Sequence, residues 1–517
     1  MTRGFLAAAL LILPATAHAD WHEASSKHFV VYSEQSPERL KEFATNLERF
    51  DRAFRRLRGL PDDLAGKAGR VTVFVMNESA AVGKLARSDN VAGFYLPRAS
   101  GSVAIVPRYA GSTMPNAMPP MAVLLHEYAH HLMMTASPNR VYPAWVSEGF
   151  AEFNATATFG RDGSVTFGQP PAYRVASLTT RFPLPLAKLF AADTLKLSDE
   201  ERGGLYARGW LLTHYLAIGA PERKGQLGSY LDAVNAGKPS LEAAAAFGDV
   251  RRLENELDRY VSGRLAALKL NSDQLPVAPV QIRKLGAGAA ALMDVRIRVT
   301  VGLPQKEMAA AYEEAKRAAA PYPNDAKAQA VLAEAAFAVR DLPAAEAAVD
   351  RAIAAAPDMI EPRIRKAKIL FTNAARAGDR TPATWTAVRK EIAAANRLDA
   401  DHPEPLMLFY RSYVQSRQKP TELAQKGLEY ALEMAPFDNT LRFNVATMLM
   451  RNGEKERARS LLAPLAFAPH GKGFAQRAAR LIAEIDAGEA KKALAELEGS
   501  DGGEDSPTVP SPSSSAP

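Results

Sequence analysis

The sequence predicts an α+β domain followed by an all-α solenoid of helical repeats. In the first half of the chain, apolar β-branched runs such as HFVVYSE (28–34) and RVTVFVMN (70–77) predict strands, which alternate with helical segments. From about residue 290 alanine dominates, and helix-forming blocks recur with a period of about 34 residues, which is typical of stacked helix pairs. The expected divisions are 1–19 for a signal peptide, 20–270 for the α+β domain, 271–495 for the repeats and 496–517 for a disordered tail.

The first 19 residues are expected to be a cleaved export signal. Arg3 precedes an apolar run from Phe5 to Leu13, and the triplet before Asp20 fits an A-x-A cleavage site. Because the run is too short to span a bilayer, we expect an exported chain without a transmembrane anchor, most simply in a bacterial periplasm.

The composition excludes several classes of protein. The chain has no cysteine, which excludes disulfides, a lipid-modified cysteine and thiolate zinc sites. The net charge is +7, but Lys and Arg are spread along the whole chain and form no basic arm. Nucleic acid is therefore not expected as a partner.

Local signals bound the first elements. Ser36-Pro37 begins a predicted helix that ends at Gly59. The segment 91–108 alternates on both sides of a Pro- and Gly-containing turn, which predicts a β-hairpin. Residues 156–200 hold many Pro and Gly and few regular signals, and we expect them to wrap the far side of the site described next.

The segment HEYAH (126–130) is followed, seventeen residues on, by EGFAE (148–152). On a helix, His126 and His130 lie one turn apart, so both imidazoles can face one ion, and Glu127 leans to the same side. Glu148 on a second helix can supply a third ligand. Three protein ligands and one open position are typical of catalytic zinc.

A histidine pair of this kind can also belong to a core or a solvated surface. Here it lies within the apolar segment MAVLLHEYAHHLMM, and PAWVSEGFAEF carries two carboxylates at i and i+4 in an apolar helix. Buried acids need a compensating partner, which favours a metal site. Met133 and Ala136 occupy the places of the glycine and third histidine of the longer metzincin motif, so that subclass is excluded.

HEYAHHLM followed by PAWVSEGFAEF resembles the Peptidase MA-like (gluzincin) domains, most strongly over 120–155 and by extension over 27–260. The resemblance implies that His126, His130 and Glu148 bind Zn²⁺ and that Glu127 is the general base for attack of zinc-bound water on a peptide bond. It further implies that Glu152 orients His126 through the other ring nitrogen, although many gluzincins carry Asp at that place.

The resemblance also implies an oxyanion-stabilising side chain and a substrate-binding edge strand. Tyr206 is the candidate for the first role and His214 the reserve. With Trp210 they share one helical face, which an aromatic core would explain equally well. SVAIVP (102–107) is either the edge strand or an ordinary internal one. No role is expected for His131, and His22, His28, His402 and His470 are expected at the surface.

The C-terminal blocks resemble tetratricopeptide (TPR) repeats, four or five in number, with an insertion near 376–385. The small residues expected where paired helices touch are Ala333, Ala345, Ala352, Ser412, Ala424, Ala431, Ala446 and Ala458. Repeats of this class bind a peptide or protein, or they only cap the first domain. The chain is thus expected to be an exported zinc metallopeptidase whose repeats recruit substrate or partner. The alternatives are a non-catalytic envelope scaffold with a vestigial peptidase-like domain, and a processing factor for one specific protein.

Overall fold

The computed structural model describes residues 20–62, 69–88, 91–109, 118–467 and 472–499. The expected signal peptide, almost all of the expected tail and His470 lie outside these residues. Within the described part of the chain, no helix is long and apolar enough to cross a membrane.

The first domain is built on a six-stranded mixed sheet in the order β4-β5-β3-β2-β1-β9. Its strands are β1 His22–Ser25, β2 Phe29–Ser33, β3 Val71–Met76, β4 Phe94–Leu96, β5 Val103–Pro107 and β9 Gln281–Lys284. Strands β2, β3 and β5 are parallel, whereas β4 pairs antiparallel with β5 and β1 pairs antiparallel with both of its neighbours. The predicted strands and the hairpin are confirmed.

SVAIVP forms β5, which lies between β4 and β3 and is therefore internal. The edge-strand interpretation of this segment is wrong, and β4 occupies the sheet edge instead. A local sequence pattern identifies a strand but does not fix its place in the sheet, which depends on pairing with distant segments. At the other edge, β9 joins the sheet from beyond the expected domain boundary at residue 270.

Helix α1 (Pro37–Arg58) confirms the helix predicted from its end signals. The Ser36 hydroxyl accepts a hydrogen bond from the Arg39 amide at 3.5 Å, and Gly59 ends the helix with a positive φ of 63°. Its apolar face joins the main core with the sheet and with the helix that carries HEYAH. The start of α1 is therefore set by the local Ser36 cap, and its orientation is set by the burial of its apolar face in the main core.

The segment between β5 and β9 builds most of the rest of the first domain. Its long helices are α3 Pro120–Ala136, α4 Ala144–Ala155, α7 Asp199–His214, α8 Gln226–Asn235 and α10 Val250–Val261. Its short elements are β6 Thr158–Phe159, β7 Val165–Phe167, η1 Ala172–Arg174, α5 Val175–Leu178, α6 Leu186–Phe190 and β8 Leu268–Leu270. Helices α4 and α7 cross closely because Gly149 and Gly209 face each other at the crossing.

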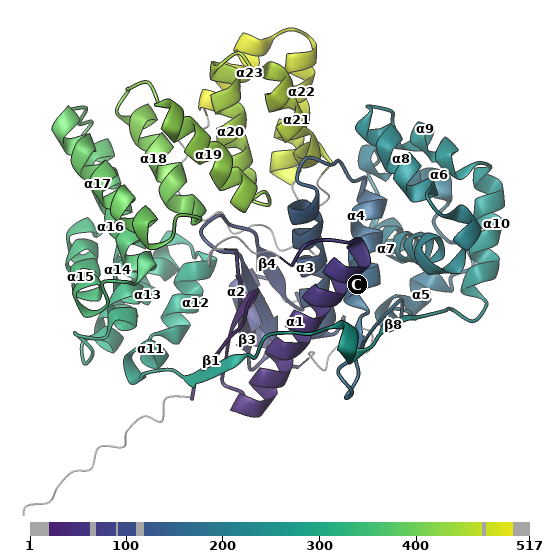
Figure 1. Ribbon diagram of the computed structural model, residues 1–517, viewed down its shortest axis with the longest axis horizontal. Coiled ribbons are helices and arrows are strands. Elements are labelled where there is room, and N and C mark those ends of the chain that lie inside the picture. The colour runs from purple at the N-terminus through teal and green to yellow at the C-terminus, as the bar shows by residue number, and fades with distance from the viewer. Residues whose placement is uncertain (1–19, 63–68, 89–90, 110–117, 468–471, 500–517) are drawn as a thin grey trace, which may run out of the picture.

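The second half of the chain is a solenoid of helix pairs (Figure 1). Its helices are α11 Ala287–Ala291, α12 Met293–Val301, α13 Gln305–Ala319, α14 Ala326–Ala338, α15 Leu342–Ala355, α16 Ile360–Arg376, α17 Pro382–Leu398, α18 Pro403–Gln415, α19 Glu422–Met434, α20 Asn439–Arg451, α21 Lys455–Ala466, α22 Lys472–Asp486 and α23 Ala490–Gly499. The small residues expected at the helix contacts are all buried. The insertion expected near 376–385 covers the end of α16, the connection 377–381 and the start of α17. Helix α16 still packs against α17, so the helix pairing is confirmed.

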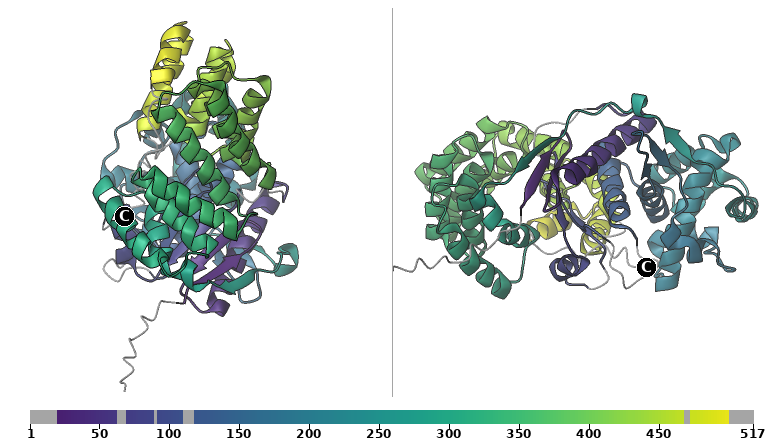
Figure 2. Two further views of the ribbon diagram at one scale, coloured as in Figure 1. Left: turned by 90° about the vertical axis from the view of Figure 1, so that its left-hand side faces the viewer. Right: turned by 90° about the horizontal axis from the view of Figure 1, so that it is seen from below.

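The solenoid returns to the first domain and packs against the far end of α3 (Figures 1 and 2). The Phe437 ring lies 4.4 Å from the His131 ring, and the Asp438 carboxylate accepts a hydrogen bond from the Ala99 amide at 2.7 Å. The buried Arg442 guanidinium donates to the Pro138 carbonyl just beyond α3. Burial lowers the pKa of Arg442 to about 10, so it stays charged at neutral pH. The repeats therefore contact the helix that carries HEYAH.

Two histidines expected at the surface are buried. His28 is only 3% exposed and His402 only 6%. That expectation is wrong for both. His28 packs against Glu48 and Asp51 of α1, and His402 lies near Glu361 and Lys368 of α16. These contacts join segments distant in sequence, which a local pattern does not show. His131 is also buried, and its Nδ1 lies 2.7 Å from the Tyr95 hydroxyl. Burial lowers the pKa of His131 to about 3, so this ring is neutral and has a packing role.

Candidate metal centre

Helices α3 and α4 bring the three predicted ligands together. One side of α3 packs Leu124, Leu125 and Leu132 into the main core, and this packing fixes the direction in which His126 and His130 project. Helix α4 packs against α3 and carries Glu148 on the face turned toward it. The ligand set thus depends on two local helical patterns and one helix–helix contact.

The donor atoms of these three side chains form a compact triangle. The Nε2 atoms of His126 and His130 are 3.2 Å apart. The Glu148 carboxylate oxygens lie 3.3 Å from His126 Nε2 and 3.7 Å from His130 Nε2. Donors about 2.1 Å from a tetrahedral zinc ion are about 3.4 Å from one another. The spacing of the triangle therefore matches a zinc site.

The centre is deep and acidic. His126 is 1% exposed and Glu148 is fully buried, whereas the His130 side chain keeps 16% exposure. Burial alone would lower the pKa of His126, but the carboxylates of Glu148, Glu152 and Glu127 outweigh it, and the pKa is raised. Such surroundings favour a cation, and the His130 side leaves access from solvent.

Glu152 lies beside His126 but does not hydrogen-bond to it. Its Oε1 is 3.8 Å from His126 Nδ1, beyond hydrogen-bond distance. Instead Glu152 accepts a hydrogen bond of 2.9 Å from Arg174 Nη2 and another of 2.9 Å from the Tyr173 hydroxyl. Among the residues that the structure describes, His126 Nδ1 has no hydrogen-bond partner. The predicted orienting bond is replaced by a contact to Arg174.

Arg174 and Tyr173 are site residues that sequence reasoning missed. Both belong to η1, within the Pro- and Gly-rich stretch that gave few regular signals. Arg174 is 4% exposed and lies with its guanidinium 4.7 Å from the centre of the Tyr206 ring. A buried arginine in a loop-rich segment needs a carboxylate partner, but the sequence does not say which one.

Tyr206 and His214 have different surroundings, although both belong to α7. The Tyr206 ring lies 6.2 Å from the His126 ring. Burial and then the Glu148 carboxylate raise the pKa of Tyr206 well above its usual value, so the phenol keeps its proton. The His214 Nε2 lies 3.0 Å from the Ala266 carbonyl, and its Nδ1 lies 2.9 Å from the Tyr260 hydroxyl. His214 is therefore a core histidine, and its reserve role is wrong.

No family model matches the chain, and no curated protein matches it. Among solved structures, the chain is similar to a thermophilic TPR protein of Thermus thermophilus, with 17% identity and a TM-score of 0.33, over 38% of this chain and 98% of that one. It is also similar to a double mutant of MamA, with 14% identity and a TM-score of 0.27, over 42% of this chain and 98% of that one. The helical repeat architecture follows from the helix pairs described above.

Proposed function

We propose that the first domain is a zinc-dependent peptidase of the gluzincin type, exported from the cytoplasm, and that the repeats recruit its substrate or a partner protein. The observation that carries this proposal is the donor triangle of His126, His130 and Glu148, with separations of 3.2, 3.3 and 3.7 Å. Two nitrogens and one carboxylate, with solvent access on the His130 side, fit a three-ligand catalytic zinc ion. When bound there, zinc supplies Lewis-acid chemistry that lowers the pKa of water and polarises a carbonyl.

Glu127 has the proton-transfer role in this proposal. It follows His126 directly on α3, is 7% exposed, and is close enough to influence the pKa values of His126 and Tyr206. A carboxylate at this place accepts a proton from the attacking water and later donates it to the leaving nitrogen. The Tyr206 phenol, protonated at neutral pH, donates a hydrogen bond to the oxygen on which negative charge develops.

The repeats give a second candidate function, that of a protein-binding scaffold in which the first domain does no chemistry. The stack of helix pairs over 287–467 and 472–499 favours it, because such stacks expose long surfaces for protein partners. The two functions differ in whether the first domain cleaves peptide bonds with a bound metal or cleaves none.

Metal removal tests the proposed activity. Incubating the purified chain with a chelator is expected to abolish cleavage of a peptide library, and adding zinc back is expected to restore it. Cleavage is measured by mass spectrometry of the products, with magnesium added back as the control. A folded, zinc-loaded chain that cleaves neither the library nor a co-purifying protein would favour the scaffold function.

Replacing Tyr206 with Phe removes only the hydroxyl next to the centre. Loss of one oxyanion donor is expected to lower kcat by about 10²–10³-fold and to leave the zinc content unchanged. Tyr215→Phe is the matched control, because its hydroxyl donates to Glu256 at 3.1 Å instead. If both variants retain full activity, oxyanion stabilisation comes from another group.

A further inference from the structure

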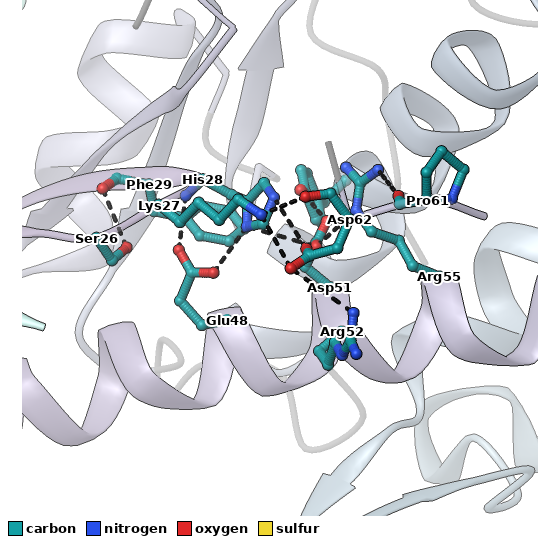
Figure 3. Close-up of polar contacts among 11 residues, drawn as sticks. Ser26, Lys27, His28, Phe29, Glu48, Asp51, Arg52, Arg55, Pro61 and Asp62 are labelled. Carbon is teal, nitrogen blue, oxygen red and sulfur yellow. Dashed lines mark hydrogen bonds and ion pairs between the residues drawn. The ribbon is translucent and has the colours of Figure 1, made fainter. Parts of the chain in front are cut away.

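A second group of potential metal ligands lies where α1 packs against the start of β2 (Figure 3). His28 directly precedes β2, Asp51 belongs to α1, and Asp62 follows that helix. One potential ligand atom from each side chain lies within 4.8 Å of the other two. In Figure 3, dashed lines join the His28 imidazole to Glu48, Asp51 and Asp62.

Glu48 fixes the orientation of the His28 ring. Its two oxygens lie 2.7 Å from the His28 amide nitrogen and 2.7 Å from Nδ1. Because a carboxylate accepts hydrogen bonds, Nδ1 carries the proton, and in the neutral ring Nε2 presents a lone pair. Histidines that bind metals commonly donate their other ring nitrogen to a carboxylate in this way. His28 has such a bond, whereas His126 lacks one.

The Nε2 atom of His28 points toward Asp62. It is buried and, within the described ranges of the chain, makes no hydrogen bond. The nearest carboxylate oxygen, Asp62 Oδ1, is 3.8 Å away. A buried lone pair facing a carboxylate is unfavourable unless a proton or a metal cation lies between them. A separation of 3.8 Å is long for a hydrogen bond, but two ligands about 2.1 Å from one cation can be this far apart.

Asp51 completes the group and is held in place from two sides. It is fully buried, and its Oδ2 lies 3.5 Å from His28 Nδ1, the nitrogen that also faces Glu48. One Asp51 oxygen lies within 4.8 Å of a His28 ring nitrogen and of an Asp62 oxygen. Its carboxylate accepts hydrogen bonds of 2.7 Å from the Tyr128 hydroxyl and 2.7 Å from Arg55 Nε. Carboxylates that bind metals are commonly supported by hydrogen bonds of this kind. Because Tyr128 belongs to α3, the group is also connected to the helix of the first centre.

We propose that His28, Asp51 and Asp62 form a second divalent-cation site, bound through His28 Nε2 and the two carboxylates, with Glu48 orienting the histidine. One nitrogen and two carboxylate ligands suit zinc. This site is separate from the triangle of His126, His130 and Glu148 and does not depend on the proposed peptidase activity.

Two cationic side chains compete with a metal for Asp62. Lys27 Nζ lies 2.9 Å and Arg52 Nη1 lies 3.6 Å from Asp62 Oδ2. Their side chains are 39% and 30% exposed, so both can turn into solvent when a cation binds. The alternative occupant is a proton on Nε2, which would make His28 an imidazolium paired with Asp62. If zinc is the occupant, removing Lys27 raises the affinity for zinc. If a proton is the occupant, removing Lys27 lowers stability and leaves zinc affinity unchanged.

The test counts the zinc ions that the full chain binds, without a histidine tag, by native mass spectrometry during zinc titration. The parent is expected to bind two. Asp62→Asn and His28→Gln are each expected to lose one and to keep the zinc at the first centre, and His130→Ala is expected to lose the other. Lys27→Met is expected to bind the second zinc ion more tightly, because a competing charge is removed.

One zinc ion per chain, unchanged in both Asp62→Asn and His28→Gln, would overturn the second site. The second site is equally overturned if Lys27→Met lowers stability and leaves zinc affinity unchanged, because the cluster is then a set of ion pairs. Asp62 is partly exposed, so its variant is expected to fold even if His28→Gln does not. Loss of the only zinc ion in Asp62→Asn, together with its retention in His130→Ala, would instead support this site and contradict the proposed function.

Discussion

Glu127→Gln is expected to lower peptide hydrolysis by about 10²–10⁴-fold while the chain keeps its zinc. The amide has nearly the shape of the carboxylate but cannot accept the proton from the attacking water. Glu127 is not one of the three residues of the donor triangle, so metal binding should persist. Initial rates on a cleaved peptide, measured together with zinc content, separate the two effects.

Glu200→Gln is the matched control, since Glu200 is exposed in the first turn of α7. Its rate should equal that of the parent. If Glu127→Gln retains turnover, the general base is a different residue. If it loses both zinc and turnover, Glu127 belongs to the ligand set.

Gly149→Ala is expected to destabilise the first domain by at least about 1–3 kcal/mol and to lower its zinc content. A Cβ added to Gly149 would lie 2.3 Å from the Gly209 carbonyl oxygen, which is backbone and cannot turn aside. Helices α4 and α7 would have to separate, and Glu148, the neighbour of Gly149, would move with α4. Thermal unfolding and elemental analysis of the same sample measure both effects.

The sign of this effect distinguishes packing from helix propensity. Alanine favours a helix interior over glycine by about 1 kcal/mol, so a gain in stability would show that the close helix crossing does not exist. Gly228→Ala in α8 is the control, because no described atom lies within 4 Å of the added Cβ. That variant should be as stable as the parent or slightly more stable.

The parts of the site that the sequence predicts are those encoded by helical spacing. His126 and His130 are one turn apart on α3, and the apolar pattern around Glu148 predicts a second buried helix. The donor triangle then needs only that α3 and α4 pack together, which their burial favours. The 34-residue spacing predicted the solenoid for the same reason, because each helix pair repeats a local pattern.

The remaining features depend on contacts between segments far apart in the sequence. Glu152 is turned toward Arg174, which lies in a segment without regular periodicity. His214 is buried among carbonyls of residues 168 and 266, which the α7 pattern does not encode. His28 begins an alternating strand, but its neighbours Glu48 and Asp51 come from α1. The sequence shows that Glu48 and Asp51 are three residues apart on one predicted helix. It does not show that they face His28.

Anomalous diffraction at the zinc absorption edge, from crystals of the zinc-loaded chain, tests the central claim most directly. The proposed peptidase centre predicts a peak about 2.0–2.2 Å from His126 Nε2, His130 Nε2 and a Glu148 oxygen. A further peak beside His28 and Asp62 would support the second site independently. Zinc-loaded crystals without a peak between α3 and α4 would contradict the metal centre and leave the repeat scaffold as the function of the chain.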